Sequence, residues 1–224
     1  LYWYQDSFII SSANANFVTP SDTFRDPSAW YHIVWRQGSN ATTLYVNGSQ
    51  IATASVSGNT AVNNNTLQCI GTSSFGGSPT NGEHLDGYFA ETIMIDGTAL
   101  DPDSFGETKN GVWIPKDASS LTYGTNGFRL TYENASNFGE DSAGSNDWTA
   151  VNLAAHDQMI DTPTFDSTSN ANFPLWSPLF KGAQNLSEGN TRFDCSTGGK
   201  GSMTSWAIAT GTKFYIECLV EHVT

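Results

Sequence analysis

The dipeptide Asn47-Gly48 constrains the fold more than any other feature of this sequence. It separates two short runs of strand-forming residues, at 43–46 and 50–54. A type I′ turn needs a positive φ at both of its central residues, and Asn-Gly adopts that turn more readily than other pairs. We therefore predict a β-hairpin over residues 43–54, which places this part of the chain in an antiparallel sheet.

Other short apolar runs recur between turn-forming clusters, which is the pattern of an all-β sandwich. Ser, Thr, Asn and Gly dominate while Leu, Lys and Glu are scarce, so the composition favours strands and turns over helices. The run at 88–95 is apolar on both faces, and we expect it in the centre of a two-sheet stack. The full set of further predicted strands covers residues 31–35, 67–71, 88–95, 128–132, 204–208 and 213–220.

Two connecting segments also have predicted structures. Residues 72–82 are Gly-rich and without periodicity, so we predict a loop there. Residues 101–106 are predicted to form one helical turn, because Asp101 suits the N-cap, Pro102 suits the first helical position and Gly106 suits the end.

The charge balance excludes several classes of partner. Nine Lys and Arg against 22 Asp and Glu give a net charge of −13, which disfavours nucleic acid and anionic lipid surfaces. No apolar run approaches the roughly 20 residues that a membrane span requires, so membrane insertion is not expected. Because the sequence starts at Leu1 without a visible signal peptide, we expect a processed chain or a fragment. Cys69, Cys195 and Cys218 fit no zinc spacing and are expected to be reduced and buried.

Three segments resemble laminin G-like domains, in the order in which that family carries them. Residues 24–34, with Trp30 and His32, are similar to the family's W-x-H strand; residues 44–48 are similar to its L-Y-V-N-G hairpin; and residues 85–100 are similar to its closing strand. The resemblance implies a concanavalin A-like antiparallel sandwich. Few residues precede Trp30, so we expect this sandwich to be incomplete at its N-terminus.

The following part resembles a block found in bacteriophage virion proteins, at residues 105–107, 111–116, 123–128, 141–148 and 157–164. A second, SPRY-like sandwich follows in those proteins, and residues 211–217 are similar to one of its first strands. The resemblance implies a laminin G-like sandwich over 1–106, a connector with some strand over 107–164, and the start of a SPRY-like domain over 165–224.

The same resemblance implies a function. It points to a non-enzymatic structural protein of a phage particle, in a fibre, appendage or surface decoration, whose partners are other virion proteins, copies of itself and a host-surface glycan. The alternative is a bacterial secreted or cell-surface carbohydrate-binding module. A glycan depolymerase is the third interpretation.

The spacing of the carboxylates argues against catalysis. Asp86, Glu91 and Asp96 lie five residues apart, and an odd spacing places neighbours on opposite faces of an extended strand. A retaining glycosidase needs two carboxyl groups about 5–5.5 Å apart. We therefore predict no catalytic residue, and we expect Glu91 to be a partly buried carboxylate with a partner.

The candidates for binding are few. Glu140, Asp141, Asn146 and Asp147 form the densest oxygen cluster and are candidate calcium ligands, although Asx turns explain them equally well and no cofactor is required. Phe75 is the aromatic residue of the predicted loop 72–82 and is a candidate for ligand binding. His32 is expected to be a hydrogen-bonded core residue or a residue of the family's sequence pattern.

Overall fold

The computed structural model describes residues 1–4, 6–12, 15–26, 29–55, 67–75, 78–109, 111–159, 176–177, 185–187, 190–194 and 203. The chain divides into two compact units, Leu1–Asn172 and Phe173–Thr224. The described residues form β-strands and two turns of 3-10 helix, with no α-helix among them. The prediction of an all-β chain is confirmed. Within these ranges, no helix has the length and apolar character needed to span a membrane.

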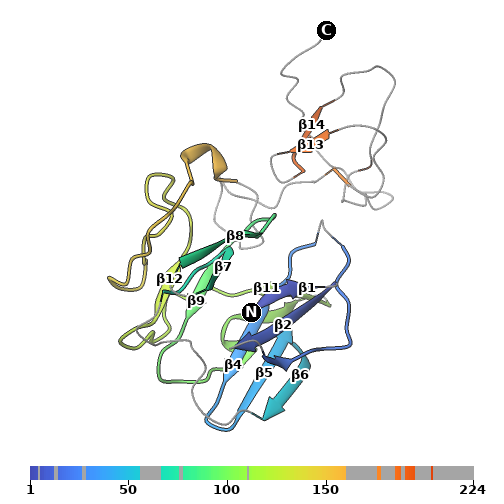
Figure 1. Ribbon diagram of the computed structural model, residues 1–224, viewed down its shortest axis with the longest axis vertical. Coiled ribbons are helices and arrows are strands. Elements are labelled where there is room, and N and C mark those ends of the chain that lie inside the picture. The colour runs from blue at the N-terminus through green and yellow to red at the C-terminus, as the bar shows by residue number, and fades with distance from the viewer. Residues whose placement is uncertain are drawn as a thin grey trace. The chain divides into compact units, whose positions relative to one another are not determined.

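The first unit begins with two three-stranded antiparallel sheets (Figure 1). Side chains from both sheets, Phe8, Ile10 and Val18 from one and Leu44 and Val46 from the other, pack into a single buried core. One sheet therefore comes from residues before Trp30, the part of the chain where we expect the sandwich to be incomplete. The strands are β1 (Tyr2–Tyr4), β2 (Ser7–Ser12) and β3 (Ala15–Val18) in the first sheet, and β4 (Ile33–Gln37), β5 (Ala41–Val46) and β6 (Ser49–Ser55) in the second.

The predicted hairpin at Asn47-Gly48 is confirmed. Val46 pairs with Ser49 across a two-residue turn, and φ is 49° at Asn47 and 76° at Gly48. Asn47 also fixes the chain that leads into β4, because its Oδ1 accepts the N–H of His32 at 2.9 Å while its own N–H donates to the carbonyl of His32 at 2.8 Å.

The predictions for residues 67–82 are wrong. Residues 67–71 are not a strand, and the predicted loop contains an antiparallel hairpin of β7 (Thr72–Phe75) and β8 (Ser78–His84). Gly71 has a φ of 80°, which breaks the extended conformation just before β7. Polar strands such as these lack the apolar alternation that sequence patterns depend on.

The predicted central strand at 88–95 is also wrong in its length and place. Only β9 (Thr92–Met94) is a strand, and its partner is β12 (Phe128–Leu130) in a two-stranded sheet. Tyr88 and Phe89 are 50% and 45% exposed, so the first part of the apolar run lies at the surface. Gly97, with a φ of 87°, turns the chain soon after β9.

The predicted helical turn is present as a 3-10 turn, η1 (Pro102–Ser104). Asp101 occupies the N-cap without a side-chain hydrogen bond to the turn; its Oδ1 lies 3.5 Å from Nε of Arg36 instead. The hairpin of β10 (Gly106–Lys109) and β11 (Val112–Pro115) follows.

Trp113 of β11 packs against the first sandwich. A Cβ atom at Gly48 would overlap its indole ring, and a Cβ at Gly106 would lie 2.6 Å from it. Its ring centroid is 5.8 Å from that of His32. The chain after residue 105 therefore covers the turn of the β5–β6 hairpin, and residues 1–100 do not complete their own packing.

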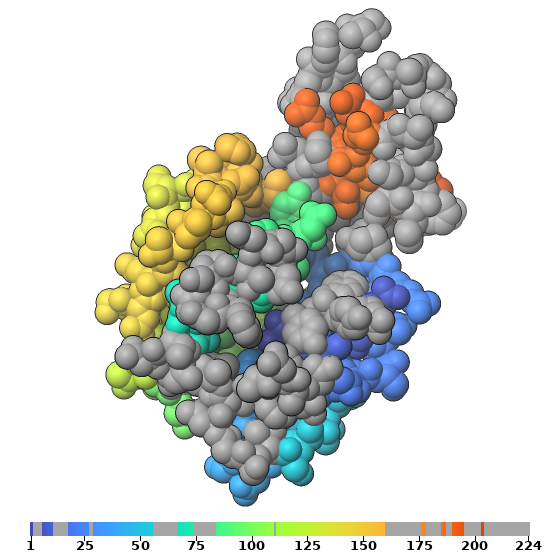
Figure 2. All heavy atoms as spheres, in the orientation of Figure 1, coloured from blue at the N-terminus to red at the C-terminus, as the bar shows by residue number. Residues whose placement is uncertain are grey.

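The rest of the first unit is mostly turns. Figure 2 shows residues 118–158, in yellow and orange-yellow, as a continuous band of surface on this unit. Besides β12 it contains one short 3-10 turn, η2 (Ala155–Asp157).

The second unit has one described hairpin, formed by β13 (Asn185–Ser187) and β14 (Arg192–Asp194). The rings of Trp176 and Phe193 lie 5.2 Å apart within it. The strands predicted at 204–208 and 213–220, together with Cys195 and Cys218, lie outside the described residues. The SPRY-like assignment and the boundaries at residues 106 and 164 stay predictions.

Candidate functional site

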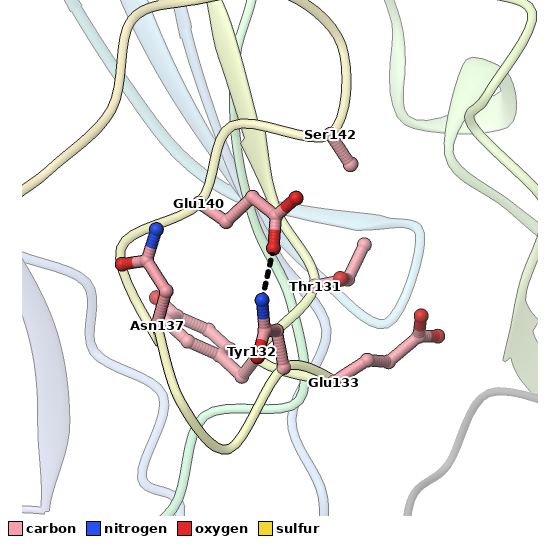
Figure 3. A pocket seen from close by; sticks show the side chains of 7 residues that line it. Thr131, Tyr132, Glu133, Asn137, Glu140 and Ser142 are labelled. Atoms are coloured by element: carbon pink, nitrogen blue, oxygen red, sulfur yellow. Dashed lines mark hydrogen bonds between the residues drawn. The ribbon is translucent and has the colours of Figure 1, made fainter.

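A pocket of about 130 Å³ opens in the segment 118–158, just after β12 (Figure 3). Its lining residues carry two carboxylates, two amides, two hydroxyl side chains and one aromatic ring. The lining residues are Thr131, Tyr132, Glu133, Asn134, Asn137, Glu140 and Ser142.

Tight turns place the amides and one carboxylate around this pocket. Ser136 donates its N–H to Oδ1 of Asn134 at 3.0 Å, which forms an Asx turn. The N–H of Asn137 then bonds to the carbonyl of Asn134, and the N–H of Glu140 bonds to the carbonyl of Asn137. Asn134 donates its side-chain amide to Oε2 of Glu140 at 2.6 Å, so these two groups are held together at the pocket (Figure 3).

Tyr132 supplies the aromatic surface and is held rigidly. Its φ of 59° ends β12 and turns the chain into the pocket. Its hydroxyl is 2.6 Å from Oγ1 of Thr92, and its ring centroid is 6.3 Å from that of Phe89. Burial raises the pKa of Tyr132 against the opposing effect of the Thr92 hydrogen bond, so the phenol stays protonated at neutral pH. Gln158 supports the backbone by donating to the carbonyls of Tyr132 and Glu133 at 2.9 and 2.7 Å.

Asp141, next to Glu140, has a separate structural role. It is 5% exposed, and its carboxylate accepts the N–H groups of Arg129, Ala143 and Asn146 at 2.9, 3.0 and 3.0 Å. Burial alone would raise the pKa of Asp141, but the backbone hydrogen bonds together hold it below its ordinary value. Asp141 therefore stabilises the loop as a charged group.

The four candidate calcium ligands thus separate into two places. Asp147 accepts the N–H of Asp141 at 2.9 Å, and the amide of Asn146 donates to the carbonyls of Thr125 and Gly127 at 3.0 and 2.8 Å. Only Glu140 lines the pocket. Within the described ranges, no three or more His, Cys, Asp or Glu side chains are grouped so as to hold a metal ion.

Each of the three carboxylates considered for catalysis, those of Asp86, Glu91 and Asp96, either bonds to a different residue or is exposed to solvent. Glu91 forms an ion pair with Arg129, with 2.6 Å between Oε1 and Nε and both side chains 16% exposed. The expectation of a paired, partly buried carboxylate is confirmed for Glu91. Asp96 accepts the backbone and side-chain N–H groups of Asn126 at 3.0 and 3.1 Å, and Asp86 is exposed.

The remaining candidates lie elsewhere. Phe75 is the last residue of β7, and its side chain is outside the described part of the structure. The backbone of His32 is hydrogen-bonded to Asn47, whereas its Nδ1 is buried without a hydrogen-bond partner among the described residues. Burial lowers the pKa of His32, so the imidazole is neutral at pH 7.

Sequence reasoning missed most of the pocket. Tyr132 continues the alternation of Phe128 and Leu130 and was therefore included in a strand. The usable signal was the regular spacing of Asn134, Asn137 and Glu140, three residues apart after a strand. Repeated turns can bring side chains with that spacing to one side of a loop.

Residues 2–103 match the family model of the concanavalin A-like lectin/glucanases superfamily, a laminin G model. With the two stacked sheets, this match confirms the predicted concanavalin A-like sandwich for the N-terminal part of the chain. No curated protein and no solved structure matches the chain. The pocket follows the matched residues in the chain, so the family match does not include it.

Proposed function

We propose that this protein binds glycans without cleaving them, and that the pocket beside Tyr132 holds a sugar unit. The observation that carries the proposal is the combination of amides, carboxylates and hydroxyls with one rigid aromatic ring in a small open pocket. Amides and carboxylates bond to sugar hydroxyls, and an aromatic face suits the C–H side of a pyranose. The match of residues 2–103 to a lectin-containing superfamily supports a carbohydrate as the ligand.

The positions of the carboxylates support binding over hydrolysis. Glycoside hydrolysis needs an acid and a second carboxyl group across the scissile bond. Glu140 is hydrogen-bonded to Asn134, and Glu133 extends away from Glu140 in Figure 3. Glu91 is engaged by Arg129 and does not line the pocket.

The setting that we propose is a bacteriophage particle, where the protein attaches the virion to a host-surface glycan. The support is the resemblance of residues 105–164 to a block of virion proteins. Many copies on one particle turn weak single-site binding into high avidity. Peptides of this chain should appear in particles purified from a lysate of the virus that encodes it. Their recovery from bacterial envelopes or culture medium alone would favour the secreted carbohydrate-binding module.

Binding is tested by titrating the purified chain with neutral, amino and acidic glycans in calorimetry. We expect Asn137→Ala to weaken binding of the recognised glycan about fivefold, as one lost neutral hydrogen bond of ~1 kcal/mol predicts. Asn40→Ala is the matched control, because this exposed amide lies outside the pocket in the turn before β5. Equal effects of the two variants would contradict the pocket assignment, and new reducing ends in the mixture would contradict the absence of cleavage.

A further inference from the structure

We propose that Phe89 forms a second sugar subsite beside the Tyr132 pocket, so that the ligand is a neutral oligosaccharide chain and not a single sugar. This inference rests on the proposed function. Its starting observation is that Phe89, a large apolar side chain, is 45% exposed. Exposed aromatic surface next to a polar pocket is typical of a binding site.

The sheet topology places the two aromatic residues at the same end of one strand pair. Thr92 and Leu130 are paired at the end of the antiparallel β9–β12 ladder. Phe89 comes shortly before Thr92 in the chain, and Tyr132 comes shortly after Leu130. Their ring centroids are 6.3 Å apart with an interplanar angle of 34°, so the exposed Phe89 lies beside the aromatic residue of the pocket.

Phe89 also lies near Gly71. A Cβ atom at Gly71 would lie 3.6 Å from Cε2 of Phe89, in van der Waals contact with the edge of the ring. The carbonyl of Gly71 accepts the N–H of Leu85 at 2.7 Å, which ties this backbone to the chain that leads to Phe89. A ring that packs beside Tyr132 loses less conformational freedom than an isolated surface ring when a ligand stacks on it.

The charges around the pocket define the class of glycan. Glu133 lines the pocket, is exposed and has no cationic partner among the described residues. The carboxylate of Glu140 bonds only to the neutral amide of Asn134 within the same ranges. The whole chain carries a charge of −13. A uronate, sialate or phosphate group would therefore be repelled, whereas a neutral chain can bond to the pocket and stack on Phe89.

The test compares glucose oligomers of one to four units, in β-1,3-, β-1,4- and α-1,4-linked series, with polygalacturonate as the acidic probe. Affinity is measured by calorimetry, and contacts by aromatic and amide side-chain NMR shifts. We expect affinity to rise from one to three units in a recognised series. Asn137 should shift with the monosaccharide, while Phe89 should shift only with the longer chains.

Phe89→Ala should weaken trisaccharide binding about tenfold and leave monosaccharide binding unchanged, since an aromatic ring contributes to binding through both its buried area and its stacking geometry. Phe89→Tyr should restore the trisaccharide affinity, which shows that the ring and not the fold is at issue. Leu85→Ala is the matched control, an exposed apolar side chain in the same segment.

The outcomes separate this inference from the function on which it rests. Pocket binding with no dependence on chain length, equal loss at all lengths in Phe89→Ala, or preference for polygalacturonate overturns the second subsite and leaves glycan binding in place. Absence of binding to every glycan overturns both.

Discussion

The sandwich of β1–β6 and the segment 118–158 differ in the polar side chains that they bury. In the sandwich, Ile10 and Leu44 are fully buried, and apolar contact between two sheets holds the strands. In the segment, the carboxylate of Asp141 is the one charged group among the buried side chains that the structure describes, and it gathers N–H groups from several turns. The segment also buries apolar side chains, such as Leu130 and Phe138, and the carboxylate of Asp141 adds a buried charge that binds its turns together next to the polar pocket.

The largest expected effect is in the sandwich. Leu44→Ala leaves a cavity between the two sheets, so the free energy of unfolding should fall by about 2–5 kcal/mol. Urea titration followed by tryptophan fluorescence measures it. Leu67→Ala is the control: Leu67 is 45% exposed, and the change should stay within ~0.5 kcal/mol. Similar losses in the two variants would contradict the assignment of Leu44 to the central core.

Asp141→Asn tests how much the buried carboxylate stabilises the segment 118–158. The Asn amide has the same shape as the carboxylate but no charge. One of its two polar atoms is a donor, although three N–H groups need acceptors. The free energy of unfolding should therefore fall by about 1.5–3 kcal/mol. Hydrogen exchange should increase at Arg129, Ala143 and Asn146 and stay unchanged in β4–β6. Glu140→Gln changes the neighbouring exposed carboxylate and should leave exchange as it is. Uniform acceleration through the sandwich would show that the two regions unfold together.

The contact between the sandwich and β11 is tested at Gly48. Gly48 has a φ of 76°, and Gly48→Ala introduces a Cβ that overlaps Trp113. We expect the free energy of unfolding to fall by about 1–3 kcal/mol. Gly97→Ala is the matched control, with a φ of 87° and no atom within 4 Å of the added Cβ, so it isolates the backbone cost of ~1–2 kcal/mol. In a double-mutant cycle, Trp113→Ala should reduce the cost of Gly48→Ala toward that of the control.

The smallest expected effect is the pH dependence. Burial lowers the pKa of His32 in the folded protein, so the unfolded chain binds more protons and stability falls as the pH drops below about 6.5, the ordinary value for His. Asp141 also has a lowered pKa, and its contribution is lost only below about pH 3.9. Urea titrations at pH 7.5 and 5.5 should differ for the native chain and agree for His32→Phe. An identical pH dependence in that variant would assign the effect to another group.

The elements that could be predicted from the sequence are those set by local chemistry. Asn47-Gly48 specifies its turn through backbone preferences, and Asp101-Pro102 begins the 3-10 turn in the same way. Glu91 was expected to have a partner because an unpaired charge does not stay buried. In each case a few neighbouring residues contain the information.

The elements that could not be predicted depend on distant contacts. The apolar run at 88–95 has the composition of a central strand, but its first residues are exposed, and Phe89 rests beside Tyr132. The pocket requires the positive φ at Tyr132 and the support of Gln158 from a later turn. Neither is visible in a local pattern of apolar and polar residues.

The pairing of β9 with β12 also sets a sequence of events during synthesis. The β4–β5–β6 sheet joins neighbours in the chain, and such hairpins close within about 1–10 μs. β9 instead waits for the stretch between Met94 and Phe128 to be made, which takes roughly 2–7 s at ~5–20 residues per second. During that interval the β5–β6 hairpin can already be formed, whereas β9 has no partner because β12 has not yet been synthesised. The surface that brings Phe89 next to Tyr132 is therefore assembled only after the hairpin that begins the fold.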